Sequence, residues 1–217
     1  MNSFLFVVMF KLKQEWRSIS DWLSALQFLL ASVFIVYLIF DSLNSKMWLS
    51  LYWVIAVFSL IHASSRGLKE ELEEEYQMLY QLLSAESVLL SGLLIGFIQN
   101  LFLLSILWGA MYFLFGNFVI NSLSFVVSLI LAAFNFSAIT HLMNGIAIRS
   151  NKSQSLYPVL TIPLIIPIIL ELYNIGAISV GINPVANNWA SDAFILSGLG
   201  LCFSVASVFL FPYIWSD

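Results

Sequence analysis

Long uncharged apolar runs limit this chain to helices that cross a lipid bilayer. The stretch from Ser87 to Ile148 contains no Asp, Glu, Lys or Arg. The chain as a whole is 61% hydrophobic and 9% charged, whereas ordinary globular domains carry about 25% charged residues. A backbone in lipid must satisfy its own hydrogen bonds, so runs of this kind predict membrane-spanning α-helices of about 20 residues.

Charged and turn-forming residues divide the chain into six predicted crossings. The run from Ser87 to Ile148 is long enough for two of them, and Gly116, Asn117, Asn121 and Ser122 favour a turn between the two. The predicted crossings are Trp22–Phe40, Met47–Ser65, two within Ser87–Ile148, Ser153–Leu170 and Ala193–Trp215. We therefore expect an all-α, polytopic membrane protein with a single domain over residues 1–217.

Two features complicate the C-terminal third. Pro158, Pro163 and Pro167 each remove a backbone donor from the fifth crossing, so we expect them to bend or locally unwind it and to serve as a gate. The glycines and asparagines between Leu172 and Ser191 favour an outer loop or a partial re-entrant turn. An additional crossing there is the alternative and would reverse the C-terminus. Glu171, at the end of the fifth crossing, is interpreted as interfacial.

Basic residues orient the predicted helices. With the N-terminus in the cytoplasm, seven of the eight Lys and Arg residues fall on the cytoplasmic side, and only Lys46 lies outside. Both termini are then cytoplasmic. Ser3–Ile19 predicts an amphipathic helix along the interface, with an extension of the first crossing as the alternative. Because apolar residues precede the first basic ones, we expect no cleaved signal peptide.

The chain lacks the motifs of several enzyme classes. It has no phosphate-binding loop, no His-Glu-x-x-His and no Gly-x-Ser-x-Gly sequence, so energy must come from another polypeptide or an ion gradient. The lone Cys202 excludes an internal disulfide, no metal site is expected, and no basic patch favours nucleic acid. An integral membrane enzyme is disfavoured because no set of catalytic side chains converges at one depth.

Two histidines are the weak candidates for a haem or metal ligand. His62 and His141 lie in separate apolar runs near their predicted cytoplasmic ends, and a histidine hydrogen-bonded to a neighbouring helix is the alternative for each. Ser137, His141 and Asn144 share one helical face, which favours His141. Gly92 and Gly96 allow close helix approach, either within the chain or in a dimer.

The connection between the second and third predicted crossings is the most informative segment. From Arg66 to Leu83 its apolar residues recur at helical spacing, opposite five glutamates within the six positions Glu70–Glu75. Anionic lipid head groups repel carboxylates, so we expect a cytoplasmic amphipathic coupling helix that contacts a basic groove on a soluble protein; a solvated acidic face is the alternative. The predicted contact residues are Arg66, Lys69, Glu70, Glu71, Leu72, Glu73, Glu74 and Tyr76.

Nearly the whole chain resembles one transporter family. The similar parts are the basic N-terminal stretch, Arg66–Leu72, Ile162–Ile168 with its Pro-x-x-x-Pro spacing, and Leu210–Trp215. With these parts the chain resembles the CcmB-type permease, the membrane subunit of the ABC transporter that exports haem for cytochrome c maturation.

The resemblance implies a multi-pass subunit of the bacterial inner membrane without its own nucleotide site. It would deliver haem for c-type cytochrome biogenesis, with ATP hydrolysed by a separate ATP-binding subunit. Six crossings are half of a typical transporter, so a second permease copy or a related haem-handling subunit is expected. The alternatives are an ABC permease for a lipid, peptide or drug, and a membrane assembly scaffold that transports nothing.

Overall fold

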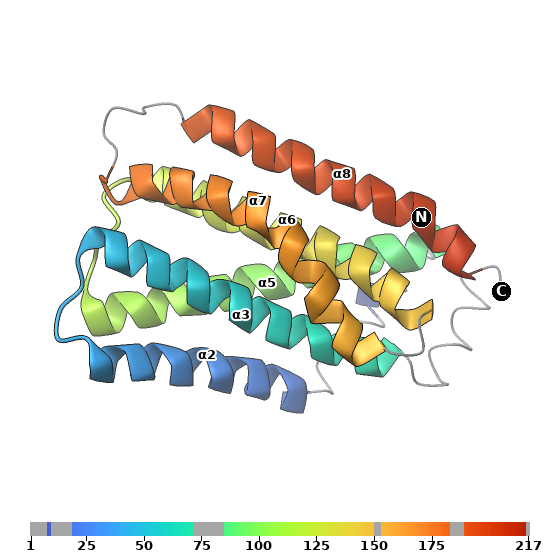
Figure 1. Ribbon diagram of the computed structural model, residues 1–217, viewed down its shortest axis with the longest axis horizontal. Helices are drawn as coiled ribbons and strands as arrows, with labels where there is room; N and C mark the ends of the chain where they lie inside the picture. The colour runs from blue at the N-terminus through green and yellow to red at the C-terminus, as the bar shows by residue number, and fades with distance from the viewer. Residues whose placement is uncertain (1–7, 10–18, 72–84, 150–152, 183–188, 216–217) are drawn as a thin grey trace.

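The protein folds as a bundle of long α-helices. The computed structural model describes residues 8–9, 19–71, 85–149, 153–182 and 189–215 (Figure 1). In this part of the chain the long helices are α2 (Ile19–Ile39), α3 (Ser45–Glu71), α5 (Ala85–Phe115), α6 (Ser122–Arg149), α7 (Ser153–Ser179) and α8 (Trp189–Trp215). Most of the predicted interfacial helix, Ser3–Ile19, lies outside the described residues.

Five of these helices are long and apolar enough to cross a membrane, and the sixth is a shorter apolar helix. The five spans are Ser45–Ser64, Leu89–Phe115, Ser122–Met143, Val159–Ser179 and Trp189–Leu210, and the apolar part of α2 is Leu23–Ile39. The chain is therefore a multi-pass membrane protein, and the prediction of an all-helical fold is confirmed.

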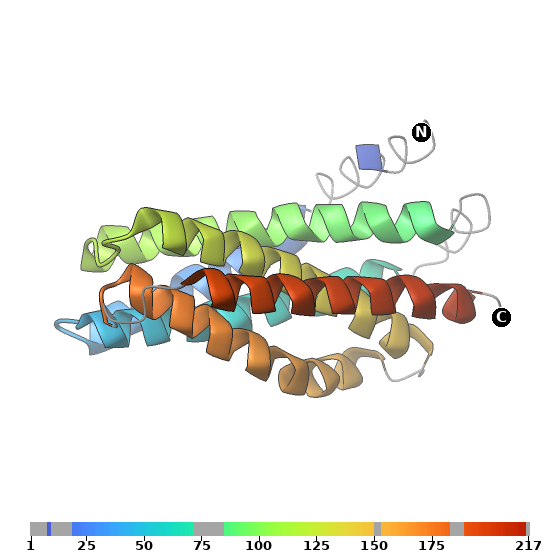
Figure 2. The ribbon, with the colours of Figure 1, turned by 90° about the horizontal axis from the view of Figure 1, so that it is seen from above.

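Successive helices run in opposite directions along the bundle (Figures 1 and 2). One end holds the described turns Phe40–Asn44, Gly116–Asn121 and Val180–Ile182, and is called the loop end here. At the other end α3 finishes at Glu71 and α5 begins at Ala85; it is called the charged end. The segment Arg66–Leu83, called the acidic connection here, begins at the charged end in the last turns of α3.

Side-chain caps and a glycine set the helix boundaries at the loop end. The side-chain oxygen of Asn44 accepts a 2.8 Å hydrogen bond from the backbone N–H of Met47, so Asn44 caps α3. Asn121 caps α6 in the same way through the N–H of Ser124. Gly116 ends α5 with a φ of 87°, a conformation that residues with a Cβ rarely adopt. The predicted break near Gly116–Ser122 is confirmed.

The prediction for the segment after Leu170 is wrong in part. Leu172–Ser179, expected in a loop or re-entrant turn, continues α7 as regular helix. The side chain of Leu172 is fully buried, so packing in the core outweighs the low helix propensity of Gly176. The turn begins only at Val180, and Gly181 within it has a φ of 73°. Residues 183–188 lie outside the described residues.

The prolines of α7 bend the helix without interrupting it. Helix α7 is continuous from Ser153 to Ser179 through all three prolines, so local unwinding does not occur, and both ribbon views show the bend (Figures 1 and 2). Pro163 and Pro167 are exposed, which places them on the outward face of the helix. The side chain of Pro158 lies outside the described part.

Helix α6 is the centre of the bundle and contacts α5, α7 and α8. In its apolar span 61% of residues are buried, against 17% in α8. Asn135, fully buried on α6, donates hydrogen bonds to the carbonyl oxygen of Leu131 on its own helix and to that of Leu196 on α8. Opposite it, Gly200 lets α8 approach, because a Cβ there would lie 2.5 Å from the ring of Phe134.

We expect Gly200→Ala to weaken the attachment of α8. The added methyl would overlap the Phe134 ring, so the free energy of unfolding should fall by about 1–3 kcal/mol. Gly198→Ala is the matched control on the same helix, because no atom lies within 4 Å of its Cβ position. Unfolding of both variants in detergent micelles measures the difference; equal stabilities would contradict the proposed contact.

Candidate functional site

The described part of the predicted coupling segment belongs to α3. Arg66, Lys69, Glu70 and Glu71 lie in the last two turns of this helix, which runs without interruption from Ser45. The second predicted crossing and the start of the acidic connection are therefore one continuous helix. Leu72, Glu73, Glu74 and Tyr76 lie outside the described residues.

His141 packs on the two glycines of α5. A Cβ at Gly92 would lie 2.7 Å from Cε1 of His141, and a Cβ at Gly96 would lie 3.3 Å from its Nε2. Between them the hydroxyl of Ser137 donates a 2.7 Å hydrogen bond to the carbonyl oxygen of Leu93. The Gly-x-x-x-Gly pair thus joins α5 to α6 within the chain, which answers the alternative of a dimer contact at these glycines.

Helix α3 reaches the same level of the bundle. The hydroxyls of Ser64 on α3 and Thr140 on α6 lie 3.1 Å apart, within hydrogen-bonding distance. Measured interhelical hydrogen bonds in membrane proteins average about 0.6 kcal/mol, so this contact fixes position more than it adds stability. We call the residues of these contacts the histidine cluster. They are Ser64, Gly92, Gly96, Ser137, Thr140 and His141. The cluster joins three helices near the charged end.

The two histidines lie on different helix pairs. The imidazole of His62 stacks on the ring of Phe28 in α2, with ring centroids 5.1 Å apart. His141, by contrast, lies against Gly92 and Gly96 of α5. Across the described ranges, no group of three or more His, Cys, Asp or Glu residues could hold a metal ion.

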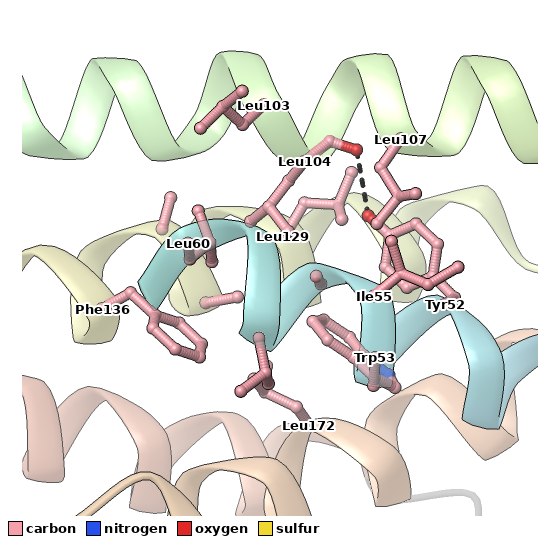
Figure 3. Packing of buried hydrophobic residues seen from close by; sticks show 14 of the residues in the cluster. Tyr52, Trp53, Ile55, Leu60, Leu103, Leu104, Leu107, Leu129, Phe136 and Leu172 are labelled. Atoms are coloured by element: carbon pink, nitrogen blue, oxygen red, sulfur yellow. Dashed lines mark hydrogen bonds between the residues drawn. The ribbon is translucent and has the colours of Figure 1, made fainter. Parts of the chain in front are cut away.

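An aromatic cluster at the loop end escaped the sequence analysis. Trp48, Tyr52 and Trp53 of α3 are buried against Phe125 of α6, with neighbouring ring centroids 5.1 to 5.9 Å apart. Figure 3 shows Tyr52 pointing to α5, where its hydroxyl donates a 3.0 Å hydrogen bond to the carbonyl oxygen of Leu104. The spacing of Trp48 and Tyr52, four residues apart on one apolar helix, was the available signal.

Trp108 of α5 adds a third indole to this cluster, with its ring centroid 5.3 Å from that of Phe125. Nε1 of Trp48, Trp53 and Trp108 is buried and has no hydrogen-bond partner in the part of the chain that the structure describes. Trp53 also lies against α7, where a Cβ at Gly176 would be 3.1 Å from its Nε1 (Figure 3). The cluster therefore joins α3 to α6 and α7 by packing of its rings, and to α5 also by the Tyr52 hydrogen bond.

Helix α3 thus has a separate anchor at each end of the bundle. The aromatic cluster holds its loop end and Ser64 holds its charged end. The acidic connection begins two residues after Ser64 in the sequence. No protein-family model, curated protein or solved structure matches this chain.

We expect Gly92→Ala to displace His141. The new methyl would overlap Cε1 of the imidazole, so the free energy of unfolding should fall by about 1–3 kcal/mol. The loss should shrink when His141→Ala is added, because the double mutant removes the overlapping ring. Gly109→Ala on the same helix is the control, since no atom lies within 4 Å of its Cβ position. Strictly additive effects in this double-mutant cycle, measured by unfolding in micelles, would contradict the contact.

Proposed function

We propose that this chain is the membrane permease subunit of an ABC transporter of the CcmB type. It acts in haem export or delivery for c-type cytochrome biogenesis, and a separate ATP-binding subunit supplies the energy. In this proposal α2 is the first of six crossings, and the charged end faces the cytoplasm of a bacterial inner membrane. The 21 residues of α2 correspond to about 31 Å of helix, enough for the hydrocarbon core.

The continuity of α3 is the observation that carries the proposal. An unbroken helix transmits axial and lateral displacement with little loss, whereas a flexible joint at Ser65 would absorb it. A partner that closes on ATP and binds the acidic connection would therefore move α3 as a unit. The carboxylates of Glu70, Glu71, Glu73 and Glu74 suit a basic groove on that partner.

The movement has a direct path through the bundle. Displacing the charged end of α3 acts first on Thr140 of α6, through its contact with Ser64. The same helix acts at the loop end on α7, because Leu49 and Trp53 pack against Gly176. Helix α7 is bent and has exposed prolines at 163 and 167, so it is the element in which a hinge costs least.

We expect charge reversal in the acidic connection to abolish docking of the ATP-binding subunit. Changing Glu70, Glu71, Glu73 and Glu74 together to Lys places like charges against a basic groove, so co-purification at physiological salt should fall at least tenfold. The control is the double variant Asp41→Lys and Asp192→Lys, which reverses two carboxylates at the loop end. Undiminished recovery of the quadruple variant would contradict the electrostatic contact.

Energy coupling separates the transporter from a passive scaffold. If the partner's ATPase is inactivated by mutation while docking is kept, haem attachment to c-type cytochromes should be lost in cells that carry the intact permease. Continued attachment at the normal rate would favour the scaffold alternative. Stimulation of ATP hydrolysis by lipid, peptide or drug, and none by haem, would favour a permease for another cargo.

A further inference from the structure

Glu171 lies inside a membrane span. Helix α7 continues to Ser179, eight residues beyond Glu171, which corresponds to about 12 Å of helix. The apolar span of this helix covers Val159–Ser179 and contains Glu171 in its central part. The earlier interpretation of Glu171 as interfacial depended on a helix that ended near Leu170, and the structure removes that premise.

The carboxylate of Glu171 makes no polar contact that stabilises the described part of the fold. Glu171 is half-buried, and no hydrogen bond or ion pair joins it to another residue in the described ranges. Its neighbours divide the helix into two faces: Pro167 and Leu170 are exposed, whereas Leu172 and Ile175 are fully buried. At 100° per residue, Glu171 stands at the border between the buried and the outward face.

This side of the bundle is the least covered. In the apolar spans of α7 and α8 only 33% and 17% of residues are buried, against 56% in α3 and 61% in α6. Lipid chains cover exposed apolar side chains without cost, but they offer no partner to a carboxylate. Ionisable residues within membrane helices almost always pair with a group of opposite charge or line a wet cavity.

Within the apolar spans that the structure describes, no Lys or Arg lies at the level of Glu171. Lys46 is the only Lys or Arg in the described apolar spans, and it lies in the first turn of α3. Lys46 is one residue from the loop end of α3, which begins at Ser45, and Glu171 is eight residues from the loop end of α7, which finishes at Ser179. The difference of seven residues corresponds to about 10 Å along the helix axis. His62 and His141 lie still farther away, toward the charged end. The described membrane spans of a second copy would therefore offer Glu171 no Lys or Arg at its own depth.

We propose that Glu171 pairs with a Lys or Arg side chain from a different membrane-spanning chain that packs against α7. The pair places a charged contact on an otherwise apolar interface and so fixes the depth at which the two chains meet. In the proposed transporter this partner is the other half of the membrane assembly, so its place in the assembly rests on the proposed function. The contact itself depends only on α7.

The test uses two synthetic single-span peptides as probes. Both are leucine-rich helices, one with Arg and the other with Gln at a central position. Energy transfer between each labelled peptide and the labelled full chain is measured in phosphatidylcholine vesicles, which carry no net lipid charge. We expect the Arg peptide to associate roughly tenfold more tightly than the Gln peptide. Equal association of the two peptides with the unchanged chain would overturn the proposal.

Three variants complete the experiment. Glu171→Gln should remove the preference for the Arg peptide, whereas Asp192→Asn, in the first turn of α8, should keep it. Preference that survives Glu171→Gln would also overturn the proposal. Glu171→Leu should leave the thermal stability of the isolated chain unchanged or higher; a marked loss would show that the carboxylate serves the fold.

The result is independent of the proposed function. Docking of an ATP-binding subunit concerns the acidic connection at the other end of the protein. If charge reversal there has no effect while the Arg preference persists, the transporter assignment fails and the interface stands. If docking is lost on charge reversal but the two peptides bind equally, the interface fails and the transporter assignment stands.

Discussion

Close approach of helix backbones around α6 is the interaction on which the rest of the structure depends. In lipid, helices gain no hydrophobic free energy by leaving the hydrocarbon, so association depends on van der Waals contact and on polar groups between helices. Glycines supply the contact on both sides of α6. Gly92 and Gly96 of α5 accommodate His141 and Ser137, and Gly200 of α8 accommodates the ring of Phe134.

Helix α3 runs without interruption from this packed bundle into the start of the acidic connection. At the loop end it is held by a cluster of buried rings. Toward the charged end it contacts α6 through the hydroxyl of Ser64 and α2 through the ring of His62, and its last turns begin the acidic connection. The two anchors differ physically. The packed rings tolerate small shifts, because within the described residues their indole donors make no directional hydrogen bonds that a shift would break. The hydroxyls of Ser64 and Thr140, in contrast, must stay within hydrogen-bonding distance of each other.

Much of the fold follows from the sequence, and one error shows where such prediction stops. The six helices and the turn at Gly116 are predictable because uncharged runs in lipid have no alternative to helix. The end of α7 was misplaced because Gly176 and the asparagines after it signal a turn in isolation. In the folded chain Gly176 is helical, since its missing side chain admits Leu49 and Trp53 of α3. A contact from another helix decides that boundary, and no local pattern carries it.

The candidate site was likewise predictable from the sequence only in part. His141 and Ser137 were placed on one helical face by their spacing, but only the tertiary structure shows that this face meets Gly92 and Gly96. Asn135 and the aromatic cluster were missed, because a single sequence does not show which of many apolar and amide side chains face a neighbour. The sequence by itself determined that the chain is a multi-pass helical membrane protein, because composition and run length dictate helices in lipid. The tertiary structure alone decided which faces meet and that Glu171 lies within a span, because both depend on contacts between distant segments.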